Sequence, residues 1–256
     1  QSFDLDMNGE KIDFNNDKEL NKADFDSYMN ECGYKDSGVE WIGYISKKIN
    51  LSRLKDFGYM YPGIVGKRGD DFSKEYKKGF KPFVPFTSIF NYSKILNQDK
   101  MQFVRNDKEK QNIVKKNDLL FLMSSEGYED IGKSSIYKDN KEVFLNSFCK
   151  GYSFTNKNIE PNFVNYLINS FNYRTNYLAK NGKGFTRINL KMEYIKDMIL
   201  ITPLKFEQKA ISLFLDKKTS QFKNQVSNIE KEIELLKEFR KTTINDVVTG
   251  KIKVIK

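Results

Sequence analysis

The sequence contains no histidine among its 256 residues. This absence excludes Ser-His-Asp triads, Cys-His pairs, His-based zinc sites and His-dependent nuclease chemistry. The sequence also lacks the NPPY-like and FxGxG-like runs that mark an amino-methyltransferase with its own methyl donor. Catalysis by carboxylates and lysines alone stays open. We nevertheless expect no catalytic residue, no metal site and no cofactor in this chain, and these absences favour a binding function.

Cysteines and long apolar runs are also scarce. The two cysteines, Cys32 and Cys149, form neither a disulfide framework nor a paired metal-ligand motif. The longest apolar run, Leu119–Met123, is far shorter than the roughly 18 residues that a membrane-spanning helix needs. No basic segment followed by an apolar segment opens the sequence. We therefore expect a folded cytoplasmic protein with no membrane contact.

Positive charge is abundant but unevenly distributed. The chain has 44 Lys and Arg against 34 Asp and Glu, a net charge of +10. Residues 1–40 carry −7 of this balance, so residues 41–256 carry +17. A body this basic attracts a polyanion, and duplex DNA is the most common one. The alternative is the solvated surface of a lysine-rich protein with no polyanionic ligand.

The pattern along the chain predicts three parts and an α+β fold. Residues 1–33 are acidic and polar, and we interpret them as a loosely ordered lead-in. Residues 34–203 predict a mixed α/β domain with a helix over Glu160–Lys180. Residues 204–256 predict one long helix with a short tail.

Short apolar runs between turn residues predict the strands of the mixed domain. Pro82 and Pro85 restrict one run to an edge strand or an extended loop, since proline has no amide hydrogen to donate. The candidate strands are Gly63–Val65, Pro82–Phe90, Met101–Val104, Asp118–Met123, Ser134–Tyr137 and Val143–Phe148.

The segment Phe206–Val248 shows a helical apolar repeat. A helix of this length with one apolar seam needs another long helix as its partner, although a helix folded back on its own domain is the alternative. The residues predicted to make this pairing are Ile211, Leu215, Phe222, Val226, Ile229, Ile233 and Leu236.

The segment Gly127–Ser134 matches the glycine-rich phosphate-binding loop that ends in Gly-Lys-Ser. A working phosphate loop opens a helix whose amide groups hold the phosphates. Here a turn and a strand-like run follow, and no later strand ends in a carboxylate suited to magnesium. A P-loop nucleotide-binding enzyme therefore remains only an alternative, and the loop is better suited to meeting a DNA phosphate.

Two basic stretches interleaved with aromatic residues, Lys67–Lys81 and Tyr173–Lys191, are candidates for nucleic-acid binding. Either stretch alone is typical of a solvated surface, but both occur in one strongly basic body. Arg and Lys can read guanine edges in the major groove, and Asn can read adenine. The predicted DNA-contacting residues are Lys67, Arg68, Asn91, Lys133, Lys183 and Arg187.

Several segments of the chain carry motifs in a characteristic order. The most specific is the tail, with an Ile/Pro/Glu-Gln/Phe-Leu-Asp order that ends in Val-Thr-Gly-Lys-Ile. The segments are Lys35–Ile45, Gly79–Phe90, Asp118–Phe121, Ser124–Ser125, Gly132–Ser134, Ile201–Thr219, Leu236–Arg240 and Val247–Ile252. Together they resemble the specificity subunit of type I restriction-modification systems. In this resemblance Lys35–Ile45 corresponds to the start of a target-recognition domain, although Ser46 stands where that family usually has proline.

The resemblance implies a target-recognition domain over residues 34–203 and a helix that packs as an antiparallel coiled coil. It implies binding of double-stranded DNA with a split site, no chemistry in this chain, and two kinds of partner. Methyltransferase subunits would modify adenine N6 with S-adenosylmethionine, and a motor nuclease subunit would use ATP and magnesium. With one recognition domain, the chain would be a half-subunit that dimerises or one half of a longer chain. A coiled-coil assembly adaptor without DNA specificity is the other alternative.

Overall fold

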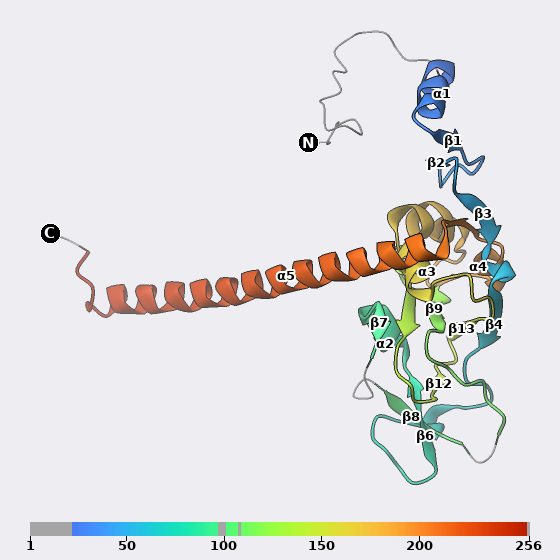
Figure 1. Cartoon of the computed structure of the whole chain (residues 1–256). Coiled ribbons are helices and arrows are strands. Elements are labelled where there is room, and N and C mark those ends of the chain that lie inside the picture. The colour runs from blue at the N-terminus through green and yellow to red at the C-terminus, as the bar shows by residue number, and fades with distance from the viewer. Residues whose placement is uncertain (1–21, 97–100, 107–108, 255–256) are drawn as a thin grey trace.

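The computed structural model describes residues 22–96, 101–106 and 109–254. A long helix, α5 (Lys205–Val248), projects away from a domain built of short strands and short helices (Figure 1). The α+β class is therefore confirmed. The described part of the lead-in differs from its prediction, because residues 22–31 form the helix α1 (Lys22–Glu31) rather than a loose segment. Residues 1–21 lie outside the described part.

A five-stranded sheet forms the centre of the domain, and its strand order is β4-β13-β9-β11-β7. The pairs are antiparallel except β11 with β7. Because β9 is buried on both sides, it reads as a continuous apolar run instead of an alternating one. The strands are β4 (Gly58–Pro62), β13 (Cys149–Phe154), β9 (Leu119–Leu122), β11 (Ser134–Tyr137) and β7 (Lys94–Ile95).

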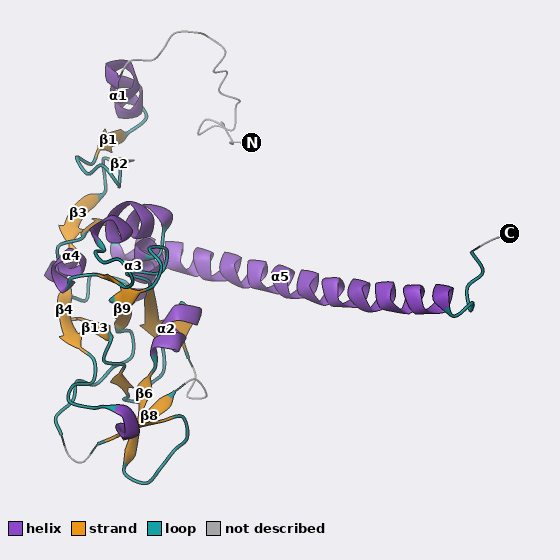
Figure 2. Ribbon diagram, turned by 180° about the vertical axis from the view of Figure 1, so that it is seen from behind, coloured by secondary structure: helices purple, strands orange, loops and turns teal. Residues whose placement is uncertain are grey.

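A four-stranded sheet, in the order β12-β6-β8-β5, lies at the end of the domain farthest from α1 (Figure 2). The interpretation of Pro82 as an edge residue is wrong, since β6 lies between β12 and β8. Pro82 is tolerated there because pairing with β12 begins only at Phe83. The strands are β12 (Phe144–Leu145), β6 (Phe80–Val84), β8 (Gln102–Arg105) and β5 (Phe72–Ser73).

Three two-stranded ladders complete the β structure. One ladder pairs a strand near the start of the domain with a strand near its end, and another pairs a loop strand with the residues that follow β9. The pairs are β1 (Tyr34–Asp36) with β2 (Tyr44–Ser46), β3 (Asn50–Arg53) with β15 (Ile199–Thr202), and β10 (Ser124–Ser125) with β14 (Ile188–Asn189). The predicted strand Gly63–Val65 is wrong, because those residues are a loop after β4.

Helices are shorter in the domain than the sequence predicts. The expected helix Glu160–Lys180 is broken into α3 (Pro161–Ile168) and the π-helix η4 (Asn172–Ala179). The break has a cause: the Asn169 side-chain amide donates to the Ser134 carbonyl at 2.9 Å, which fixes the end of α3 against β11. The other short helices are α2 (Phe86–Asn91), α4 (Met192–Lys196), η1 (Leu54–Asp56) and η2 (Gly69–Asp71).

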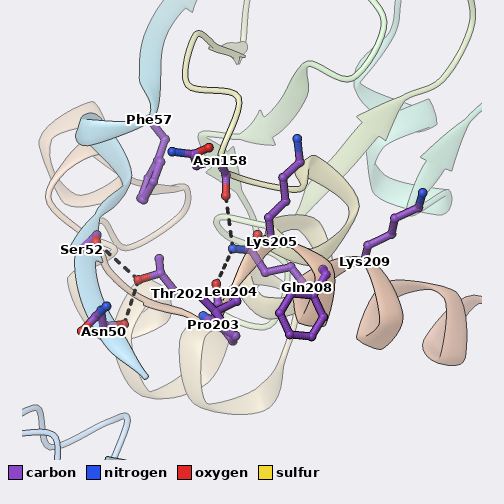
Figure 3. A pocket seen from close by; sticks show the side chains of 11 residues that line it. Asn50, Ser52, Phe57, Asn158, Thr202, Pro203, Leu204, Lys205, Gln208 and Lys209 are labelled. Atoms are coloured by element: carbon purple, nitrogen blue, oxygen red, sulfur yellow. Dashed lines mark hydrogen bonds between the residues drawn. The ribbon is translucent and has the colours of Figure 1, made fainter. Parts of the chain in front are cut away.

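The foot of α5 is anchored by polar side chains in the domain. The buried Gln208 side chain accepts a hydrogen bond from the Glu160 amide and donates one to the Pro203 carbonyl, each at 2.8 Å. Glu207 caps the helix by accepting from the Leu204 amide at 2.8 Å. A pocket opens beside these residues (Figure 3). No helix of the described chain is long and apolar enough to span a bilayer.

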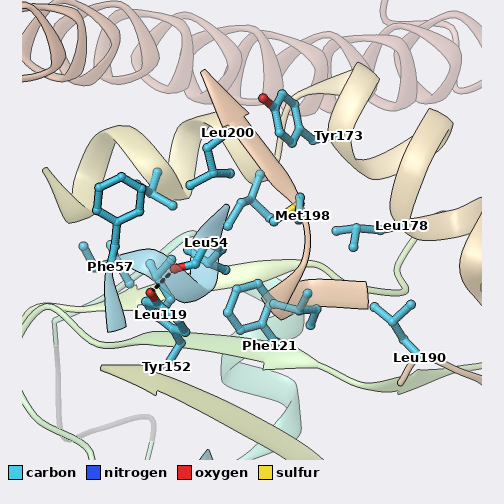
Figure 4. Close-up of a cluster of buried hydrophobic side chains, with 14 of the residues drawn as sticks. Leu54, Phe57, Leu119, Phe121, Tyr152, Tyr173, Leu178, Leu190, Met198 and Leu200 are labelled. Carbon is cyan, nitrogen blue, oxygen red and sulfur yellow. Dashed lines mark hydrogen bonds between the residues drawn. The ribbon is translucent and has the colours of Figure 1, made fainter. Parts of the chain in front are cut away.

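The central sheet has an apolar core on each face. Side chains of β9 alternate between the two cores, with Leu119 and Phe121 on the side of α3 and η4. Leu120 and Leu122 face the side of α2 and β12. In the first core the Tyr152 hydroxyl donates to the Leu54 carbonyl at 2.5 Å, so its one polar atom is satisfied (Figure 4).

Candidate nucleic-acid interface

Strand register brings several distant loops to one end of the central sheet. Strands β4 and β9 end where β13, β11 and β7 begin, because Pro62 pairs with Lys150, Leu122 with Cys149 and Phe121 with Ser134. The segments that leave or enter the sheet at this end are residues 63–68, 91–93, 123–125, 132–133 and 146–148. Three of these segments carry predicted DNA-contacting residues.

Lys133 and Asn91 come together at this end of the sheet. Lys133 immediately precedes β11, and its Nζ lies 4.8 Å from the centre of the Phe90 ring. Phe90 and Asn91 are the last residues of α2, and Asn91 is exposed. The cation–π contact therefore places the Lys133 ammonium at the C-terminal end of α2, the helix end that also carries Asn91.

Lys183 and Arg187 lie on a hairpin that is fixed at its base. The Lys183 amide donates to the Asn189 carbonyl at 3.0 Å, and the Asn189 amide donates back at 2.9 Å. Gly184 permits this turn, since its φ is +144° and a Cβ there would lie 2.0 Å from the Arg187 carbonyl oxygen. Phe185 is fully exposed at the tip.

The same hairpin is joined to the sheet by an aromatic contact. The Arg187 guanidinium lies 5.4 Å from the centre of the Phe148 ring, and Phe148 is exposed just before β13. Pairing of β14 with β10 holds the hairpin next to the residues that follow β9. The structure therefore brings Lys183 and Arg187 to the end of the sheet that carries Lys133.

Lys67 and Arg68 follow β4 at this end, but their side chains differ in environment. Lys67 Nζ pairs with Glu109 at 2.7 Å, and its side chain is only 5% exposed. Arg68 is exposed, and its backbone amide donates to Asp71 at 3.0 Å. Arg68 is thus available to a ligand, whereas Lys67 serves the loop by neutralising Glu109.

Phe148 and Phe90 are the site residues that sequence reasoning missed. Both are exposed aromatic residues that orient a cation, Arg187 in one case and Lys133 in the other. No local signal could have identified them, because the contacts join residues 39 and 43 positions apart (187 − 148 and 133 − 90). Only the strand register creates these pairs.

The Gly127–Ser134 loop does not have the geometry of a nucleotide site. Ser134 opens the strand β11, so no helix amide groups converge on the loop. The Ser134 hydroxyl is buried and donates to the Asn165 side chain at 3.0 Å. Gly132 has a φ of +72°, and a Cβ there would contact Leu178 at 2.7 Å. The Gly-Lys-Ser spacing therefore belongs to a packed turn, and nothing supports the P-loop alternative.

Burial alters the ionisation of several groups in the domain, and a thiol and a carboxyl are two of them. Burial raises the pKa of the Cys149 thiol to about 12, which keeps it protonated and unreactive at neutral pH. Burial also raises the pKa of Asp118, which accepts hydrogen bonds from Tyr61 at 2.6 Å and Ser153 at 2.7 Å. Among the described residues, no group of three acidic or Cys side chains could hold a metal ion.

The arrangement defines a class: a mixed α/β domain with a cationic, aromatic end and a projecting helix. The family profile of the type I restriction modification DNA specificity domain matches residues 46–235. Because this match covers most of the sequence, the chain belongs to that family. The chain is also 34% identical over 137 residues to the putative type I restriction enzyme MjaX specificity subunit of Methanocaldococcus jannaschii, a match covering 52% of this chain and 30% of the relative.

Solved structures share the fold. A chain from work on complex assembly and conformational transition of the type I R-M system matches 86% of this chain at a TM-score of 0.59 and 14% identity, over 50% of its own length. The HsdS subunit of Thermoanaerobacter tengcongensis matches 77% of this chain at a TM-score of 0.51 and 12% identity, over 42% of its own length. This chain thus spans half or less of the length of these relatives.

Proposed function

We propose that this chain reads a DNA sequence for a type I restriction-modification complex. The observation that carries the proposal is the convergence of Asn91, Lys133, Lys183 and Arg187 at one end of the sheet in a member of the specificity-domain family. The cations would hold phosphates, which fixes the position of the domain on the duplex. Arg68 and Asn91 have the side-chain chemistry that reads guanine and adenine edges.

The aromatic contacts support recognition by reducing conformational freedom before binding. Arg187 on Phe148 and Lys133 on Phe90 are held in preferred orientations in the free protein. A side chain that is already oriented loses less rotamer entropy when it binds, a cost of about 0.5–1.5 kcal/mol for a flexible side chain. This preorganisation favours a defined contact geometry over a diffuse electrostatic attraction.

Catalysis would belong to other subunits. The proposal assigns adenine-N6 methylation to methyltransferase subunits with S-adenosylmethionine, and cleavage to a motor nuclease subunit with ATP and magnesium, all in the cytoplasm. A split DNA site would require a second recognition domain, supplied by another copy or by the other half of a longer chain. The exposed apolar seam of α5 supports a helical partner of this kind.

A binding-site selection from a random duplex library tests the proposal. The purified chain should enrich one half-site and bind it more tightly than scrambled DNA, with affinity falling as salt rises. Uniform binding to every sequence would contradict sequence recognition. An absence of DNA binding at low salt would favour the coiled-coil adaptor instead.

A further inference from the structure

Phe185 is the most exposed large apolar residue of the described chain. Its exposed fraction is 106%, so no other described side chain covers its ring. The neighbouring exposed aromatic residue, Phe148, is 57% exposed and already contacts the Arg187 guanidinium. Isolated exposed apolar side chains are common on protein surfaces, so exposure alone assigns no role to Phe185. The hairpin that carries it, residues 182–189, supplies two further observations.

The hairpin is held at its base on both arms. On one arm the Gly182 amide donates to the Leu178 carbonyl at 3.1 Å, and a Cβ on Gly182 would lie 2.6 Å from the Ile188 side chain. On the other arm Ile188 is only 2% exposed, and the Asn189 side-chain amide donates to the Arg187 carbonyl at 3.2 Å. The hairpin therefore projects an apolar ring outward from a fixed support.

Cations flank the ring on both sides. Lys183 lies two positions before Phe185, and Arg187 lies two positions after it. Residues 173–191 contain no Asp or Glu that could neutralise these cations locally. The central part of a protein–protein interface is depleted of charged residues, so this setting suits a protein partner less well. An apolar side chain between cations suits duplex DNA, where phosphates flank stacked base pairs and an apolar wedge can enter between them.

The position of the hairpin points to the same ligand as the proposed function, on which this inference rests. Pairing of β14 with β10 places the hairpin next to the residues that follow β9. That end of the sheet also carries Lys133. The Phe185 ring therefore projects from the surface that would face the duplex.

We propose that the Phe185 ring inserts between two adjacent base pairs of the bound duplex, while Lys183 and Arg187 contact phosphates beside the opened step. Insertion separates the two base pairs and bends the duplex, and the energy required depends on the base sequence. Pyrimidine–purine steps such as TA and CA/TG are the easiest to unstack. Phe185 thereby selects a flexible step in the half-site without a hydrogen bond to any base.

Fluorescence of 2-aminopurine, an adenine analogue that brightens when it is unstacked, tests the insertion. The probes are duplexes carrying the half-site that the full chain enriches, with 2-aminopurine in place of each adenine in turn. TA and CA/TG steps all contain an adenine, so the series covers every step that Phe185 is expected to open. At saturating protein, the unsubstituted chain should brighten one position, and that position should lie in a pyrimidine–purine step.

Three variants assign the signal to the ring. Phe185→Ala should still bind the duplex through its cations but give no brightening at saturation, and selection with this variant should lose the preference for the pyrimidine–purine step. Phe185→Leu should keep part of the signal, because leucine is also an apolar wedge. Phe206→Ala removes another exposed aromatic ring, at the foot of α5, and should match the unsubstituted chain.

Three outcomes would overturn the proposal, and they separate it from the proposed function. Duplex binding with no bright position would show that no step is opened, and would leave DNA recognition standing. An unchanged bright position with Phe185→Ala would show that another group opens the step and that the Phe185 ring faces a different partner, such as a protein subunit. An absence of duplex binding at low salt would remove the proposed function and the insertion together.

Discussion

The Tyr166 hydroxyl on α3 donates a hydrogen bond to the Asp216 carboxylate on α5 at 2.5 Å. Lys94 on β7 also donates to Asp216 and forms an ion pair with it. Burial acts to raise the pKa of Asp216, but the hydrogen bonds from Lys94 and Tyr166 outweigh it and hold the pKa below its usual value. One carboxylate thus connects the long helix to both a helix and a strand of the domain.

Replacing Asp216 by asparagine should lower the free energy of unfolding at neutral pH by about 1 kcal/mol, because Lys94 loses its ion pair at a site where the two side chains are only 25% and 30% exposed. A carboxyl with a lowered folded pKa stabilises the protein above its unfolded pKa, and this stabilisation is lost as pH falls through the folded pKa. The difference between variant and parent should therefore shrink below about pH 4. Urea unfolding at several pH values measures it, and Glu238→Gln on the exposed surface of α5 is the control.

The Lys183 and Arg187 hairpin should contribute binding strength without sequence preference. If both side chains contact phosphates, the double alanine variant should bind all sequences more weakly and reduce the slope of log affinity against log salt by about two. Fluorescence anisotropy across a salt series measures the slope. Lys116→Ala with Lys141→Ala, at the opposite end of the sheet, should leave it unchanged; an equal loss in that variant would argue against a localised interface.

Arg68 should contribute to the choice of sequence. Its side chain is exposed beside the sheet end, so Arg68→Ala should cost about 1–3 kcal/mol on the preferred site and relax preference at one base pair. A selection from randomised duplexes, repeated with the variant, reveals which position is relaxed. An unchanged profile with weaker binding throughout would instead make Arg68 a phosphate contact.

The chain alone should be catalytically silent. Purified without partners and supplied with magnesium, ATP and S-adenosylmethionine, it should neither methylate DNA, cleave it nor hydrolyse ATP. Lys133→Ala should reduce DNA binding modestly, since Lys133 lies at the cationic end of the sheet against Phe90, and should change no ATPase signal. ATP turnover that disappears with this substitution would restore the phosphate-loop interpretation.

Charges placed on the seam of α5 should prevent association. Ile229→Asp combined with Ile233→Asp would bury two carboxylates in the helix pair, which is too costly without partners. Sedimentation should show a monomer that is still folded by circular dichroism, because both residues lie on the exposed part of α5. Persistence of a dimer would place the contact elsewhere.

The sequence predicts α5 well because its signal is local. Apolar residues recur at helical spacing, and the helix extends from Lys205 to Val248 as the pattern indicates. The helix predicted over Glu160–Lys180 has a similar pattern but is interrupted, because Asn169 bonds to Ser134 across 35 residues. No window of the sequence contains that contact, so the break could not be predicted.

In the candidate site, too, the local sequence pattern could be predicted, whereas contacts between distant residues could not. Composition indicated basic stretches, and the family resemblance indicated DNA. Neither shows which basic side chains are exposed to a ligand and which are already in an ion pair with a carboxylate of the protein. Lys67 is paired with Glu109, which lies 42 positions further along (109 − 67), whereas its neighbour Arg68 is exposed. The contact between the Arg187 guanidinium and the Phe148 ring likewise depends on strand pairing in the folded domain, which brings these two residues together.

The cationic end of the sheet is built from several separate segments of the chain, and this limits how its DNA sequence preference can be changed. Its residues come from the segments after β4 and β9, from the end of α2 before β7, from the segments before β11 and β13, and from the hairpin around Phe185. A loop transplanted from a related protein would bring only some of the DNA-contacting residues. The neighbouring segments at this end of the sheet would still be those of the original protein. We therefore expect a new preference to require exchange of the whole domain between the β3–β15 ladder and the foot of α5, rather than exchange of a single loop.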